Sequence, residues 1–126
     1  MNDKLVPEYG HPERRPRGLT GGGIGALCGA FLTLPALLLA FISAGAGHGH
    51  YTFARLLFPI PMLATLLTNN QISNTLIVAA ILQFPFYGLI VGFGIGRRKM
   101  LPVVAVVFAH VAGVVGCFLN LIPNFS

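Results

Sequence analysis

Two histidines separated by one glycine are the first residues that could do chemistry. His48 and His50 lie in a glycine-rich stretch between two apolar runs. Imidazole nitrogens are ligands of copper or zinc, and copper needs no carboxylate. A tetrahedral site would need a further ligand from Met62, Cys28, Cys117 or a partner chain. The alternative is that both histidines lie among lipid headgroups at the end of a membrane helix.

A second set of polar side chains lies near the middle of the long apolar runs. It comprises Thr33, Gln83, Tyr87 and His110. Polar groups at this depth are costly unless paired, and they often mark a transport path or a ligand. Two interpretations stay open, because Gln83, Tyr87 or His110 could also serve only to satisfy one another and the carbonyls of Phe31 and Ile81, which Pro35 and Pro85 free. Haem or pigment bound to His110 is a further alternative, although the fold requires no cofactor.

Cationic side chains form the third set, which comprises Arg55, Arg97, Arg98 and Lys99. All of them follow the last acidic residue, Glu13. They are predicted to bind lipid phosphate or acidic residues of another subunit. Because no carboxylate lies within or between the apolar runs, paired-acid hydrolysis, Ser-His-Asp triads and proton relays through acids are excluded there. The protein is therefore not expected to be an enzyme.

Composition places these residues in a membrane protein. The chain has 126 residues, of which 55% are hydrophobic and 9% are charged, with a net charge of +5. The basic residues flank the apolar runs, which is a topology signal. We therefore expect no nucleic-acid partner. The predicted location is the bacterial inner membrane, with the N-terminal tail in the cytoplasm.

The predicted fold is an all-α membrane protein, a small bundle of four hydrophobic helical segments. Residues 1–20 form a polar, mobile tail, and residues 21–126 form the transmembrane domain. The segments cover residues 24–44, 52–68, 75–96 and 101–122, and the second is short and proline-broken. Proline removes a helical hydrogen bond and frees a carbonyl four residues earlier. Helix breaks are accordingly predicted at Pro35, Pro59, Pro61 and Pro85.

Two topologies fit this pattern. If all four segments cross, the basic tail and the basic turn at residues 97–99 lie on opposite sides, against the positive-inside rule. If the second segment dips in and returns, both lie on the cytoplasmic side. The two arrangements place Cys28 and Cys117 in the same leaflet or in opposite leaflets, respectively. We favour four helical segments with the second one short, kinked or partly re-entrant.

Small residues at four-residue spacing predict how the segments pack. In lipid, close contact between helices depends on small residues that let backbones approach. Three of the segments carry such strips, which are Gly21, Gly25 and Gly29, then Gly88, Gly92 and Gly96, and finally Ala105, Ala109 and Gly113. These segments are predicted to pack tightly together. The second segment has no strip and is predicted to lie at the periphery or against another protein.

The function expected from these features is non-catalytic. We expect an accessory or structural subunit of a larger membrane complex or a homo-oligomer, in contact with membrane lipids and with other membrane subunits or copies of itself. One alternative is ion or small-solute transport through the midplane polar residues. The other is binding of copper, haem or pigment through His48, His50 or His110.

Overall fold

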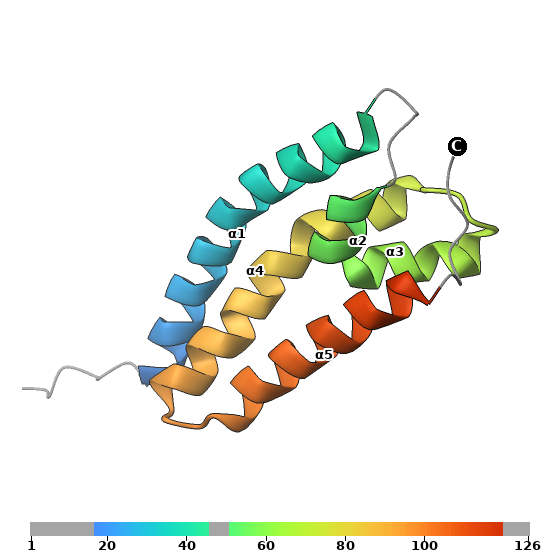
Figure 1. The fold of residues 1–126 in the computed structure, drawn as a ribbon. Helices are drawn as coiled ribbons and strands as arrows, with labels where there is room; N and C mark the ends of the chain where they lie inside the picture. Colours follow the sequence, from blue (N-terminus) through green and yellow to red (C-terminus); the bar gives the residue numbers. More distant parts are fainter. Residues whose placement is uncertain (1–16, 46–50, 120–126) are drawn as a thin grey trace, which may run out of the picture.

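The chain folds into a bundle of helices (Figure 1). The computed structural model describes residues 17–45 and 51–119. No strand occurs within these ranges, so the predicted all-α class is confirmed for them. In chain order the helices are α1 (Arg17–Ala44), α2 (Thr52–Leu57), α3 (Pro59–Ala64), the 3-10 helix η2 (Thr65–Thr68), α4 (Asn74–Gly96) and α5 (Leu101–Phe118).

Three of these helices are long and apolar enough to cross a membrane. α1, α4 and α5 have 28, 23 and 18 residues, and even the shortest extends about 27 Å at 1.5 Å per residue. The hydrocarbon core of a bilayer is about 30 Å thick. Length and composition thus fit a membrane protein. α1 begins at Arg17, inside the stretch predicted as a tail, and its buried Gly18 packs against the side chain of Arg97.

α1 and α4 pack antiparallel, with their backbones in contact. Gly21 faces the carbonyl of Gly92, and Gly25 faces that of Gly88. A Cβ atom at Gly21 or Gly25 would overlap with the facing carbonyl oxygen, so the approach requires glycine. The structure therefore brings together the glycine strips of the first and third long apolar runs.

The antiparallel pairing sets the topology. The start of α1 lies beside the end of α4, where a Cβ added to Gly96 would lie 2.6 Å from the carbonyl oxygen of Arg17. The other ends of both helices therefore lie together at the opposite end of the bundle. The segment of α2, α3 and η2 lies in that half of the bundle and ends beside the start of α4, so it enters the bundle without crossing it (Figure 1). Among the described residues, only α1, α4 and α5 are therefore long and apolar enough to cross a membrane, and α2 and α3 do not run the length of the bundle.

The re-entrant segment formed by α2, α3 and η2 is central, so the prediction of a peripheral second segment is wrong. It contacts α1, α4 and α5, and Phe58, Pro59, Pro61 and Met62 are buried. Small residues are not the only side chains that allow close packing of helices. The rigid ring of Pro59 also does so, because it packs directly on Gly113 of α5.

α5 therefore packs differently from the prediction. Gly113 and Cys117 face the re-entrant segment and are buried, whereas Ala105 and Ala109 are exposed. Residues at four-residue steps drift by about 40° around a helix each time. The strip of α5 consequently turns away from the other helices towards the start of this helix.

The four prolines have different effects. α1 continues through Pro35, and α4 continues through Pro85, so neither residue ends a helix. The predicted break does occur at Pro59, the first residue of α3, after Phe58 with φ −124° and ψ 54°. Pro61 lies in the first turn of α3, where a helix tolerates proline because the N–H groups there have no helical acceptor.

Candidate functional site: a polar layer around the broken helix

The break between α2 and α3 leaves backbone carbonyls in need of donors. The carbonyl of Leu57 would normally accept a bond from the residue four positions later, which is Pro61 and has no N–H. Gln83 of α4 supplies the missing donor, because its Nε2 donates to the Leu57 carbonyl at 2.9 Å. Gln83 is 6% exposed, so this hydrogen bond is shielded from the surroundings.

His110 of α5 supplies a donor to the neighbouring carbonyl, that of Leu56. Its Nε2 lies 3.1 Å from the carbonyl oxygen of Leu56. A carbonyl can only accept, so Nε2 carries the proton in this contact. The two neighbouring carbonyls at the end of α2 are therefore held by two different crossing helices.

Thr33 lies close to a carbonyl that is freed by a different proline. Its Oγ1 lies 2.9 Å from the Gly29 carbonyl in its own helix and 3.5 Å from the Ile81 carbonyl in α4. Pro85 deprives Ile81 of its helical donor. The sequence interpretation paired this freed carbonyl with Gln83, Tyr87 or His110. The structure instead brings the Thr33 hydroxyl of α1 near it, and the single proton of that hydroxyl makes its shorter bond to Gly29.

Aromatic rings connect the members of the layer. Phe58 contacts Phe84 edge to face at a centroid distance of 5.4 Å, Phe84 contacts Tyr87 at 6.4 Å, and Tyr87 contacts the His110 ring at 5.8 Å. Edge-to-face pairs are favoured by the quadrupoles of the rings. The rings thereby hold α4 and α5 at the distance that the hydrogen bonds of Gln83 and His110 require.

Two polar atoms in the layer make no hydrogen bond to the described residues. These atoms, Gln83 Oε1 and Tyr87 Oη, are both buried. Both side chains line a hollow of about 290 Å³ beside Ile60, Pro61 and Phe86. An unsatisfied buried acceptor is costly. The pair therefore offers one carbonyl acceptor and one hydroxyl to a small polar molecule.

The cations predicted to contact lipid or a partner lie in two separate places. Arg97, Arg98 and Lys99 are exposed at the end of the bundle where α1 starts. The guanidinium of Arg97 lies over the Phe93 ring at 4.4 Å from its centroid. Arg55 does not share this surface, because it is 7% exposed on the inner side of α2.

The described residues bring no metal ligands together. No group of three or more His, Cys, Asp or Glu side chains occurs in residues 17–45 and 51–119. Cys117 packs against Met62 and contacts the Pro59 carbonyl at 3.4 Å, whereas Cys28 is exposed in the opposite half of the bundle. His48 and His50 lie outside the described residues. Metal binding by these histidines stays a prediction.

Sequence reasoning found the donors of the polar layer but not their acceptors. Gln83 and His110 stood out as polar residues in apolar runs. The Leu56 and Leu57 carbonyls were missed, although the position of Pro61 four residues after Leu57 was a usable signal.

Comparison with protein-family models, curated proteins and solved structures finds no match to this chain. What the protein does is therefore inferred from its own residues and their geometry.

Proposed function

We propose that the protein is a non-catalytic integral membrane protein that serves as an accessory or structural subunit of a larger membrane complex or a homo-oligomer. The observation that best supports this proposal is the position of two alanines on α5. Ala105 and Ala109 lie four residues apart on the exposed surface of that helix. Small residues at this spacing allow another helix to approach closely in lipid.

The other small residues at this spacing already pack within the described part of the chain, whereas Ala105 and Ala109 do not. The glycine strips of α1 and α4 pack against each other, and Gly113 packs against Pro59. Ala105 and Ala109 have no such use within the described chain. A helix from another subunit would bury them by the same backbone approach that joins α1 to α4.

The polar layer also favours a structural role. Gln83 and His110 use their donors to hold the carbonyls of Leu57 and Leu56. These hydrogen bonds fasten the re-entrant segment to the crossing helices, because a backbone carbonyl left unpaired in lipid costs several kcal/mol. Fixing an element in this way requires no substrate.

Native mass spectrometry of protein extracted in a gentle detergent tests the proposal. We expect the wild-type chain to appear as an oligomer or with partner subunits, and we expect Ala109→Leu to reduce that association. Val111→Leu is the matched control, since Val111 is also exposed but lies about 160° away around the helix. A monomeric wild-type chain without partners, or equal association of both variants, would contradict the proposal.

The basic residues at one end of the bundle support a proposed orientation of the protein in the membrane. Arg17 and residues 97–99 lie at the same end of the bundle, and positive charge near membrane helices favours the cytoplasmic side. We place this end at the cytoplasmic face of a bacterial inner membrane. The end of α5 then lies at the outer face.

Transport is a second candidate, favoured by the unpartnered Gln83 Oε1 and Tyr87 Oη. These atoms would offer a small solute or ion two polar contacts at mid-depth. Flux of protons, potassium and glycerol into proteoliposomes tests this candidate. Tyr87→Phe is the most specific variant, because it removes only the hydroxyl, which has no partner among the described residues, and keeps the packing of the ring. Loss of flux in this variant supports transport, whereas flux that survives Gln83→Leu combined with His110→Leu eliminates the polar layer as its path.

A further inference from the structure

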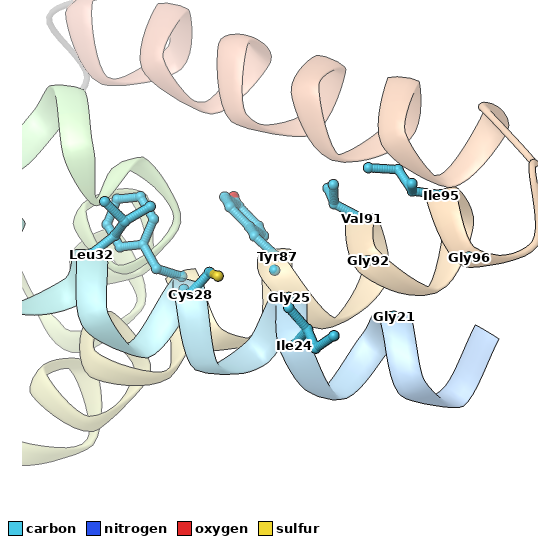
Figure 2. Close-up of a pocket in the computed structure, with 13 residues that line it drawn as sticks. Gly21, Ile24, Gly25, Cys28, Leu32, Tyr87, Val91, Gly92, Ile95 and Gly96 are labelled. Atoms are coloured by element: carbon cyan, nitrogen blue, oxygen red, sulfur yellow. The ribbon is translucent and has the colours of Figure 1, made fainter. Parts of the chain in front are cut away.

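A groove of about 480 Å³ runs along one side of the α1–α4 pair (Figure 2). The backbones of the glycine strips form part of its wall, and the side chains of Cys28, Leu32, Val91 and Ile95 form much of the rest. Apart from the Tyr87 ring and its hydroxyl, the lining side chains are hydrocarbon or thiol. The groove therefore suits an apolar occupant.

The length of the groove limits what that occupant can be. It extends along α4 from Phe84 to Gly96, which is about 18 Å at the rise of an α-helix. One leaflet of the hydrocarbon core is about 15 Å deep, whereas a helix that crosses both leaflets needs about 30 Å. The groove thus matches an acyl chain within one leaflet better than a crossing helix.

One end of the groove is strongly cationic. Its last lining residue, Gly96, directly precedes Arg97, Arg98 and Lys99, which are all exposed. The backbone of Arg17 lies against Gly96, so a fourth cation starts at the same place. No acidic residue follows Glu13 in the sequence. An anionic group above this end of the groove would therefore meet no carboxylate of residues 17–119.

We propose that the groove binds one anionic phospholipid. An acyl chain lies along the glycine-lined wall, and the phosphate lies among Arg98, Lys99 and Arg17. Arginine donates two parallel hydrogen bonds to a phosphate, and lysine adds a point charge. The depth of one leaflet and the cationic end together select a lipid with a negative headgroup over a zwitterionic one. This site is independent of the Ala105 and Ala109 surface.

Lipid titration of the detergent-solubilised full-length protein tests the proposal. Dioleoyl phosphatidylglycerol and dioleoyl phosphatidylcholine have the same acyl chains and differ in headgroup charge. We expect native mass spectra to retain one phosphatidylglycerol per chain and the melting temperature to rise with that lipid. Phosphatidylcholine is expected to bind at least tenfold more weakly. Equal binding of the two lipids, or the same stabilisation by inorganic phosphate alone, would overturn the proposal.

Variants separate the two halves of the site. Arg98→Gln with Lys99→Gln removes two cations at the headgroup and is expected to weaken phosphatidylglycerol binding on the order of tenfold. Cys28→Phe fills the groove and is expected to abolish the one-lipid complex. Leu27→Phe is its control, because Leu27 is 73% exposed and does not line the groove. Retention of the complex in Cys28→Phe would overturn the proposed position of the acyl chain.

Alkylation of the wild-type cysteines gives a measurement that does not depend on a variant folding. Cys28 lines the groove and is exposed, whereas Cys117 is fully buried. A lipid-soluble maleimide should modify Cys28, and phosphatidylglycerol should slow that reaction more than phosphatidylcholine does. If dilution to the monomer rather than lipid removal exposes Cys28, the groove is occupied by another copy of the chain and the proposal is wrong.

Discussion

The side chain of Gln83 in α4 donates a hydrogen bond of 2.9 Å to the carbonyl oxygen of Leu57, at the point where α2 ends. This contact joins a crossing helix to the deepest part of a segment that does not cross. His110 makes the corresponding contact with Leu56 from α5. The re-entrant segment is thus fixed on two sides by polar side chains, and it can stay broken within the bundle because its carbonyls are satisfied.

Gln83→Met tests how much this contact stabilises the fold. Methionine is close to glutamine in size but cannot donate to the Leu57 carbonyl, which is then left buried without its donor. We expect a loss of about 1–3 kcal/mol in the free energy of unfolding. Thermal unfolding followed by circular dichroism in detergent measures it. Leu82→Met, at an exposed neighbouring position, should change little, and equal melting of both variants would show that the contact does not stabilise the segment.

Gly25→Ala and Gly23→Ala form a matched pair on α1. A Cβ at Gly25 would overlap with the backbone carbonyl of Gly88, whereas a Cβ at Gly23 meets no atom within 4 Å. Backbone cannot move aside as a flexible side chain can, so we expect Gly25→Ala to destabilise the bundle by about 1–3 kcal/mol. Gly23→Ala should be neutral or slightly stabilising, because alanine favours helix.

The same unfolding measurement compares this pair. Similar stabilities for Gly25→Ala and Gly23→Ala would contradict the close approach of α1 to α4. A larger effect at Gly23 would point to an unidentified contact on the outer face of α1.

Gly113→Leu tests the packing of the re-entrant segment on α5. A Cβ at Gly113 would lie 3.1 Å from the Cβ of Pro59, so a full leucine side chain must push α3 away. Cys117, which is 0% exposed, should then react with maleimide several-fold faster. Val111→Leu is the control, because Val111 is exposed on the same helix and lies away from the Ala105 and Ala109 surface. Unchanged reactivity of Cys117 in Gly113→Leu would mean that α3 does not depend on this contact.

The three-crossing topology predicts that the two ends of the chain lie on opposite sides of the membrane. Reporter fusions check this, with green fluorescent protein active in the cytoplasm and alkaline phosphatase active outside it. We expect fluorescence from an N-terminal fusion and phosphatase activity from a C-terminal one. Fluorescence from both ends would instead require an even number of crossings, and the re-entrant segment would have to span.

Several features followed from the sequence alone because they depend on local properties. The lengths of the apolar runs predicted α1, α4 and α5, and the chemistry of Pro59 predicted the break after Phe58. Glycines at four-residue spacing must share a helix face. The sequence therefore also indicated Gly21, Gly25, Gly88 and Gly92, which the structure brings together.

The partners of these features were decided only by tertiary structure. Half-buried or buried residues of α5 recur at alternating steps of three and four, at Val103, Val106, His110, Gly113 and Cys117. Steps of four drift by about 40° each time, so the strip leaves that face between Gly113 and the start of the helix, and Ala105 and Ala109 are exposed. Likewise, Gln83 and His110 were visible as polar residues, but their acceptors exist only where α2 ends in mid-bundle. Whether a segment crosses or returns depends on contacts between residues far apart in the chain, and no local pattern contains them.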